Sequence, residues 1–252
     1  MSSAPLRRCA VVLAAGFGSR LATGSLGGPP KPWTRVAGVP LFQRTCRSLE
    51  LAGCSEVVVV LGHEADTLRR HIESEIETRL PVSFVINEQY HLSNGVSVLA
   101  ATERVGEQFI LTMADHVFGD DVMRLARSHV PPDGGATLVV DYKLESIFDM
   151  DDATKVLEKD GRIAEIGKVL PQYNCVDTGL FLCTSALLDS LREVVKRRGD
   201  ASLSQGVQGL AKAGKMTVLD LGEGFWQDID TPKMLEYAEK RLRERGGGAS
   251  GP

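Results

Sequence analysis

The segment Cys9–Ala15, CAVVLAA, runs directly into GFGSRL at 16–21, and PKPW follows at 30–33. The apolar run is continuous rather than alternating, which is typical of a parallel strand buried on both faces. Glycines at 16 and 18 allow positive φ and leave no Cβ in the way of a ligand. The stretch therefore predicts a buried first strand that ends in a tight loop.

The loop after this strand has the chemistry of a phosphate site. Its successive backbone N–H groups can surround anionic oxygens, Arg20 adds a rigid fork of donors, and Lys31 adds a mobile positive charge. A G-x-G pair alone is a weak signal, because glycine after a strand often makes only a turn. Neither the G-K-[ST] of a P-loop nor the third glycine of a dinucleotide fingerprint is present. The combination with Ser19, Arg20 and Lys31 nevertheless predicts a triphosphate site.

Composition limits the class of protein. The chain has 252 residues, 43% of them hydrophobic and 25% charged, and a net charge of −4. These values fit a soluble globular protein with no overall basic field for nucleic acid, so we expect no nucleic-acid partner. No apolar run has the length of a membrane span, so we expect no membrane insertion and a cytoplasmic location. The five cysteines form no metal-spaced pair and are interpreted as reduced core thiols.

Strand and helix patterns alternate along the chain. We expect strands over 57–61, 82–86, 109–113, 136–140, 176–183 and 216–221, and helices over 40–51, 65–78, 185–198, 203–213 and 231–245. Asp160-Gly161 between short β-like runs indicates a hairpin. The sequence therefore predicts an α/β fold, Rossmann-like and doubly wound. We expect a mainly parallel sheet with helices on both faces and a small β-hairpin lobe on the acceptor side.

Domain organisation follows from the same pattern. Residues 1–245 are expected to form a single domain, and residues 246–252 a disordered, Gly-rich tail. In such sheets, ligands bind at the carboxyl ends of the strands. Gly16 and Asp115 both fall at such ends.

Aspartates near two of these ends are candidate metal ligands. Asp115 follows a buried strand, and Asp228 comes shortly before a helix opened by Thr231-Pro232. A triphosphate site calls for a divalent cation to neutralise its charge, and Mg²⁺ is satisfied by few carboxylates together with phosphate and water. Asp230 is a natural helix cap, so Asp228 is the preferred second ligand, although the choice between them stays open. His116 is expected to have a positioning role rather than to act as a base. A phosphate monoester is already anionic near neutral pH, so no base is needed to deprotonate it.

These motifs resemble those of the nucleotidyltransferases that activate sugar phosphates and alcohol phosphates. The matching patterns are L-A-A-G-x-G-[ST]-R-[LM] with P-K, a strand ending in Asp115, and W-x-D-[IV]-x-T-P at 226–232. The spacer at 22–29 is longer than expected. The resemblance implies a nucleotide-diphospho-sugar transferase type of fold, in which Arg20, Lys31 and Asp115 act in catalysis and Asp115 and Asp228 bind Mg²⁺. The implied triphosphate-binding residues are Ala14, Ala15, Gly16, Phe17, Gly18, Ser19, Arg20 and Lys31.

Further segments resemble the CTP-dependent inositol-1-phosphate cytidylyltransferases, which make CDP-inositol. They are NGVSVL at 94–99, LTMADHVF at 111–118 and the motifs within 166–184. The resemblance implies that Asn94, Gly95 and Ser97 contact the pyrimidine, although Asn94 alone also fits a plain helix cap. It implies that Lys168 holds the acceptor phosphate. The implied contacts to the inositol hydroxyls are Asp177 and the backbone of Thr178 and Gly179.

Other acceptors, and a function of another class, also fit parts of this pattern. Phosphocholine, an aminophosphonate or a sugar 1-phosphate are alternative acceptors, with CTP or UTP as donor. A non-catalytic nucleotide sensor is the alternative of another class, and it would be expected to lose a metal carboxylate or the phosphate lysine. Expected partners are small-molecule substrates, with a homodimer and a separate membrane phosphotransferase as further candidates.

Overall fold

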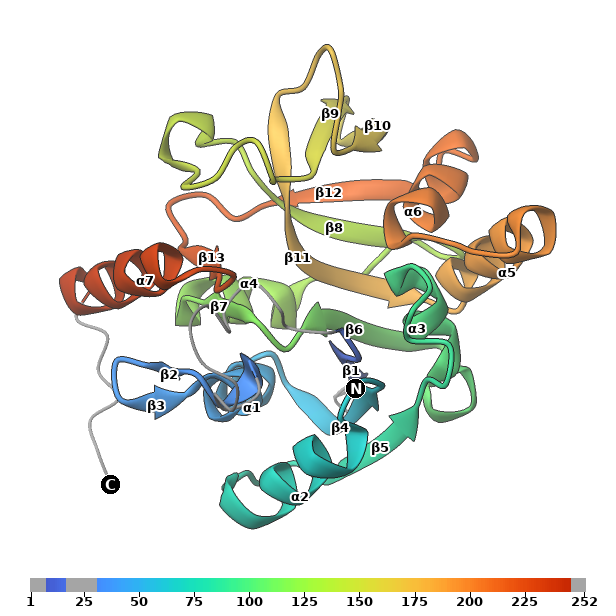
Figure 1. Ribbon diagram of the computed structural model, residues 1–252. Coiled ribbons are helices and arrows are strands. Elements are labelled where there is room, and N and C mark those ends of the chain that lie inside the picture. The colour runs from blue at the N-terminus through green and yellow to red at the C-terminus, as the bar shows by residue number, and fades with distance from the viewer. Residues whose placement is uncertain (1–7, 17–30, 246–252) are drawn as a thin grey trace, which may run out of the picture.

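A computed structural model describes residues 8–16 and 31–245. One sheet of nine strands, in the order β5-β4-β1-β6-β11-β8-β12-β10-β9, runs through these residues and is shown in Figure 1. The strands are β1 (Arg8–Ala14), β4 (Cys54–Leu61), β5 (Val82–Ile86), β6 (Gln108–Met113), β8 (Ala136–Asp141), β9 (Lys155–Lys159), β10 (Arg162–Gly167), β11 (Cys175–Thr184) and β12 (Met216–Asp220).

Helices cover both faces of the sheet. They are α1 (Leu41–Leu51), α2 (Ala65–Glu75), α3 (Asn94–Ala100), α4 (Asp120–Ser128), α5 (Ala186–Arg198), α6 (Leu203–Lys212) and α7 (Pro232–Glu244). Val11 and Leu13 of β1 belong to the core beneath α3, α5 and α6. Ala10 and Val12 belong to the core beneath α1, α2 and α4. Alternate residues of one strand thus enter two cores, which explains the continuous apolar run.

The expected α/β class is confirmed, but the sheet is mixed. Strands β5, β4, β1 and β6 are parallel neighbours, and so are β8 and β12. Strand β11 lies between them and runs antiparallel to both β6 and β8. Its apolar run reads the same in either direction, so the pattern alone could not show this reversal. Antiparallel pairing places the start of β11 beside the carboxyl end of β6.

The hairpin at Asp160-Gly161 is confirmed. Both residues have positive φ, 52° and 75°, as a two-residue turn of the hairpin type requires. Arg162 pairs with Lys159 directly after the turn. Strand β9 also pairs with the start of β11, so the β9–β10 hairpin lies beside that end of the strand in Figure 1. The residues after β10 are thereby brought close to the start of β11.

Several boundaries and short elements differ from expectation. The second helix ends at Glu75 rather than at 78, because the Gln43 side chain bonds both the N–H and the C=O of Glu77. The late strand ends at Asp220. Helix α4, the 3-10 turns and the short pairs β2–β3 (Arg35–Val36, Val39–Pro40) and β7–β13 (His116–Phe118, Trp226–Asp228) were not predicted.

All five cysteines are free and buried, which confirms that they are core residues. Burial raises the pKa of the Cys9, Cys46, Cys54 and Cys175 thiols to about 12. Among the helices described, none has the length and apolar character needed to cross a bilayer. Residues 17–30 and 246–252, including Phe17, Gly18, Ser19 and Arg20, lie outside the described residues.

Gly95→Ala should destabilise the fold. A Cβ at Gly95 would lie 2.5 Å from the carbonyl oxygen of Ala201 and 2.7 Å from Leu191 Cδ2. We expect the free energy of unfolding in urea to fall by about 1–3 kcal/mol, the usual cost of overpacking. Gly106→Ala is the matched control, because a Cβ there meets nothing within 4 Å. Equal stability of the two variants would contradict this packing.

Candidate functional site

The carboxyl ends of β1 and β4 form the first part of the site. The N–H of His63 donates to the Ala15 carbonyl over 3.2 Å. A Cβ at Gly62 would lie 2.8 Å from that carbonyl and 2.4 Å from Tyr90 Cβ, so only glycine allows this close approach. Ala14, Ala15 and Gly16 therefore lie at the carboxyl edge of the sheet, as predicted. Lys31 opens the next described turn, Lys31–Trp33.

The residues expected near the pyrimidine lie at the start of α3. Ser97 is buried, and its hydroxyl accepts a bond from Asn87 Nδ2 over 2.9 Å. The helix cap is Ser93, not Asn94. Asn94 instead accepts the Leu203 N–H on its side-chain Oδ1 over 2.8 Å, at the start of α6. Gly95 packs against Ala201. Pyrimidine contact by these three residues stays a prediction.

The expected metal ligands Asp115 and Asp228 come together through a short strand pair. Asp228 lies directly opposite His116 in the antiparallel β7–β13 ladder. The next residue, Ile229, donates its N–H to the Asp115 carbonyl over 2.9 Å. Burial raises the pKa of the Asp228 carboxyl, and the charges of Asp230 and Asp115 raise it further, while His116 opposes the shift. Two segments more than a hundred residues apart thus supply one acidic site.

His116 is fixed on several sides. Its Nδ1 lies 2.6 Å from Asp115 Oδ1. Its ring is nearly parallel to that of Trp226, at 6.1 Å between centroids and 19° between planes. A Cβ on Gly179 would lie 2.5 Å from His116 Nε2, and Gly179 has a φ of +75°. The imidazole therefore has little conformational freedom. This fits a role in which His116 positions the Asp115 carboxylate.

The expected acceptor residues lie at the start of β11, on the other side of His116. Asp177 Oδ1 accepts the Gly179 N–H over 2.7 Å, and Thr178 is buried with its hydroxyl bonded to the Val139 carbonyl. Burial raises the pKa of the Asp177 carboxyl to about 6, and the Gly179 N–H and the charges of His116 and Lys168 hold it from rising further. Thr178 can offer only its backbone to a ligand, as predicted.

Asp152 is a site residue that the sequence did not reveal. Its carboxylate, with those of Asp228 and Asp230, offers oxygens that all lie within 4.8 Å of one another. Lys168 Nζ donates to Asp152 Oδ1 over 2.9 Å and also to the Asp152 carbonyl. The run Asp149-Met150-Asp151-Asp152 has several acids, and nothing in it distinguishes Asp152.

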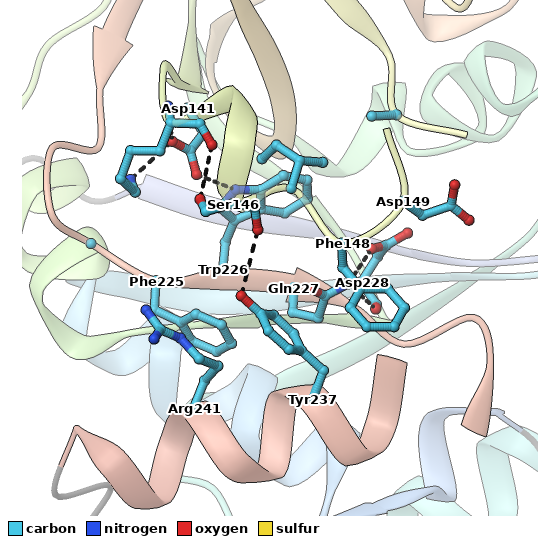
Figure 2. A pocket seen from close by; sticks show the side chains of 14 residues that line it. Asp141, Ser146, Phe148, Asp149, Phe225, Trp226, Gln227, Asp228, Tyr237 and Arg241 are labelled. Atoms are coloured by element: carbon cyan, nitrogen blue, oxygen red, sulfur yellow. Dashed lines mark hydrogen bonds and ion pairs between the residues drawn. The ribbon is translucent and has the colours of Figure 1, made fainter. Parts of the chain in front are cut away.

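A small pocket opens beside Asp228, between the segment 141–153 and α7 (Figure 2). On one side, Trp226 Nε1 donates to the buried carboxylate of Asp141 over 3.0 Å. On the other, the Phe148 ring lies 5.1 Å from that of Tyr237, centroid to centroid, and the Tyr237 hydroxyl lies 3.5 Å from the Ser146 carbonyl. These contacts fasten the segment that carries Asp152 to the rest of the fold.

The assembled groups define what this edge can bind. Asp115, Asp152, Asp177, Asp228 and Asp230 concentrate negative charge here, so the arrangement calls for a cation. Carboxylate oxygens are the donors that Mg²⁺ prefers, so Asp115 with Asp228 or Asp230 fits that ion. Lys168 beside Asp177 provides one positive and one accepting group, as a phosphorylated polyol requires.

This fold and site define a nucleotidyltransferase. The MobA-like NTP transferase domain matches residues 10–211. The chain belongs to this family.

Individual relatives agree with this assignment. The chain is 39% identical over 247 residues to a "Bifunctional IPC transferase and DIPP synthase" of Rubrobacter xylanophilus, covering 96% of this chain and 53% of that protein. It is 31% identical to the protein of the same name from Archaeoglobus fulgidus, covering 92% and 43%. The chain thus spans about half the length of these relatives. The solved inositol-1-phosphate CTP transferase from T. maritima is 30% identical, with a TM-score of 0.78 and coverage of 94% and 96%.

Asp177→Asn should stabilise the protein at neutral pH. The Asp177 pKa is about 6 in the folded chain and about 4 when unfolded. Folding therefore takes up a proton between these pH values, and the free energy of unfolding falls as pH rises through this window. Asparagine keeps an oxygen for the Gly179 N–H and avoids this loss. We expect a gain of about 1–2 kcal/mol at pH 7 and a flatter pH profile in urea unfolding. Destabilisation at pH 7 would contradict the assigned pKa.

Proposed function

We propose that this chain transfers CMP from CTP to inositol 1-phosphate, giving CDP-inositol and pyrophosphate with Mg²⁺. The observation that carries the proposal is the convergence of two sets of residues on His116. Asp115 and Asp228 lie on one side of the imidazole. Gly179 lies on the other side and donates its N–H to the Asp177 carboxylate. The names of the relatives, which include inositol-1-phosphate CTP transferase, supply the nucleotide and the acceptor.

The chain's own residues divide the work. The 14–20 loop and Lys31 bind the triphosphate, and Arg20 and Lys31 stabilise charge on the departing pyrophosphate. Asp115 and Asp228 hold Mg²⁺, with Asp230 as the alternative to Asp228. When bound, this ion would neutralise phosphate charge in the transition state. Lys168 holds the acceptor phosphate, which attacks the α-phosphorus in line while Asp177 accepts bonds from the inositol hydroxyls.

Other acceptors have less support. Phosphocholine would call for aromatic rings around its quaternary ammonium, but Phe148 and Tyr237 pack on one another. No comparable structural argument counts against an aminophosphonate or a sugar 1-phosphate, so both acceptor types are included in the test. A non-catalytic sensor is disfavoured, because Asp115, Asp228 and Lys31 are all present. A homodimer and pairing with a membrane phosphotransferase remain proposals.

The direct test is pyrophosphate release with Mg²⁺. CTP, UTP, ATP and GTP are each combined with inositol 1-phosphate, phosphocholine, aminoethylphosphonate and glucose 1-phosphate. We expect release with CTP and inositol 1-phosphate, and an enzyme-dependent product with the mass of CDP-inositol. Release with another pair alone would reject the acceptor or donor assignment, and no release at all would favour the sensor.

Asp115→Ala should abolish turnover without unfolding the protein. Asp115 is partly exposed at the end of β6 rather than packed in the core, so its loss removes a metal ligand and the partner of His116. We expect kcat to fall at least about a hundredfold, as for loss of a group that stabilises transition-state charge. Asp133→Ala, which changes an exposed aspartate in the turn before β8, is the control. Near-normal turnover of Asp115→Ala at saturating Mg²⁺, with an unchanged circular dichroism spectrum, would reject this role.

A further inference from the structure

The contact between Lys168 and Asp152 joins the acceptor side of the site to its acidic side. Lys168 follows directly after β10, and its side chain is 56% exposed. An exposed lysine ordinarily samples many rotamers. Here the ammonium uses two of its three N–H donors on one residue, the carboxylate and the carbonyl of Asp152. Among the described residues no third partner of this ammonium is found, so its third donor can bind another anion.

Asp152 is itself held in place. Its N–H donates to Asp149 Oδ1 over 3.2 Å. The preceding residue, Asp151, is held as well, because its carbonyl accepts a hydrogen bond from Nζ of the buried Lys155 over 3.0 Å. Two residues on, the Thr154 carbonyl accepts the Asp177 N–H over 2.9 Å. The segment with Asp152 is therefore tied to the strand that carries Asp177.

The charges around Asp152 explain why a lysine stays there. Asp228 and Asp230 offer oxygens within 4.8 Å of its carboxylate, and like charges this close repel one another. The Lys168 ammonium offsets part of that charge. Lys168 also lowers the pKa of Asp177, so the same ammonium is felt on the acceptor side. The position of the Lys168 ammonium, between these carboxylates and Asp177, therefore depends on Asp152.

We propose that Asp152 is a positioning residue, which holds the Lys168 ammonium where the acceptor phosphate binds. This inference rests on the proposed function. Without the Asp152 carboxylate, Lys168 spends only part of its time in the binding conformation, and the apparent affinity for the acceptor falls by that fraction. CTP contacts no part of this pair in the proposed arrangement. The effect should therefore fall on the acceptor alone.

The kinetic test is Asp152→Asn, assayed with CTP and inositol 1-phosphate. We expect the KM for inositol 1-phosphate to rise about three- to tenfold, with kcat, the KM for CTP and the Mg²⁺ requirement within about twofold. Asp151→Asn is the matched control, because the hydrogen bond that Asp151 makes within the described residues uses its backbone carbonyl and not its carboxylate. In a Lys168→Ala background, which itself raises the acceptor KM, Asp152→Asn should have no further effect.

Three kinetic results would overturn the proposal. A lower acceptor KM in Asp152→Asn would mean that charge repulsion, not positioning, dominates. A raised Mg²⁺ requirement with an unchanged acceptor KM would make Asp152 a metal ligand. An equal increase in KM with and without Lys168 would show that Asp152 acts independently of the lysine.

A second measurement keeps the inference separate from the proposed function. Acylation of Lys168 by an N-hydroxysuccinimide ester is followed by mass spectrometry without substrates. We expect Lys168 to react faster in Asp152→Asn than in the unaltered protein, with the exposed Lys233 as internal reference. Equal rates would overturn the inference even if the enzyme turns over. Conversely, absence of turnover with faster acylation would reject the proposed function and retain the contact.

Discussion

Like charges held together at one edge of the sheet are the constraint on which this site depends. Burial, together with the charges of Asp230 and Asp115, raises the pKa of the Asp228 carboxyl, which shows the cost of holding an ionised carboxylate here. Folding energy from the packed strands keeps these groups in place despite the repulsion. A cation or a positively charged side chain is therefore most favourable here, and both Lys168 and the proposed Mg²⁺ would supply that positive charge.

Reversal of one strand makes the site two-sided. Because β11 runs antiparallel to β6, its first residues lie where β6 ends. Asp177 and Gly179 thereby reach His116 from the far side, which a parallel strand could not do without an added loop. The hairpin β9–β10 then folds back onto β11 and delivers Lys168. The residues proposed for the donor and acceptor sides meet because one sheet contains strands of both directions.

The sequence predicted what depends on local pattern. The continuous run of β1 indicated a strand buried on two faces, and Asp160-Gly161 indicated the hairpin turn. The direction of β11 and the β7–β13 pairing were not predictable, because non-local contacts decide them. Asp152 escaped for a related reason: only its approach to Lys168, Asp228 and Asp230 in space separates it from neighbouring acids. The role of Asn94 at the start of α6 is likewise a tertiary contact.

In the proposed arrangement, the β7–β13 ladder assembles a metal site from Asp115 and Asp228. The most direct measurement is anomalous diffraction at the manganese edge, from crystals grown with CTP and Mn²⁺ in place of Mg²⁺. The account predicts an anomalous peak bound by carboxylate oxygens of Asp115 and Asp228 and by the triphosphate. A peak bound by Asp152 and Asp230 without Asp115, or a triphosphate bound away from the carboxyl end of β1, would contradict it.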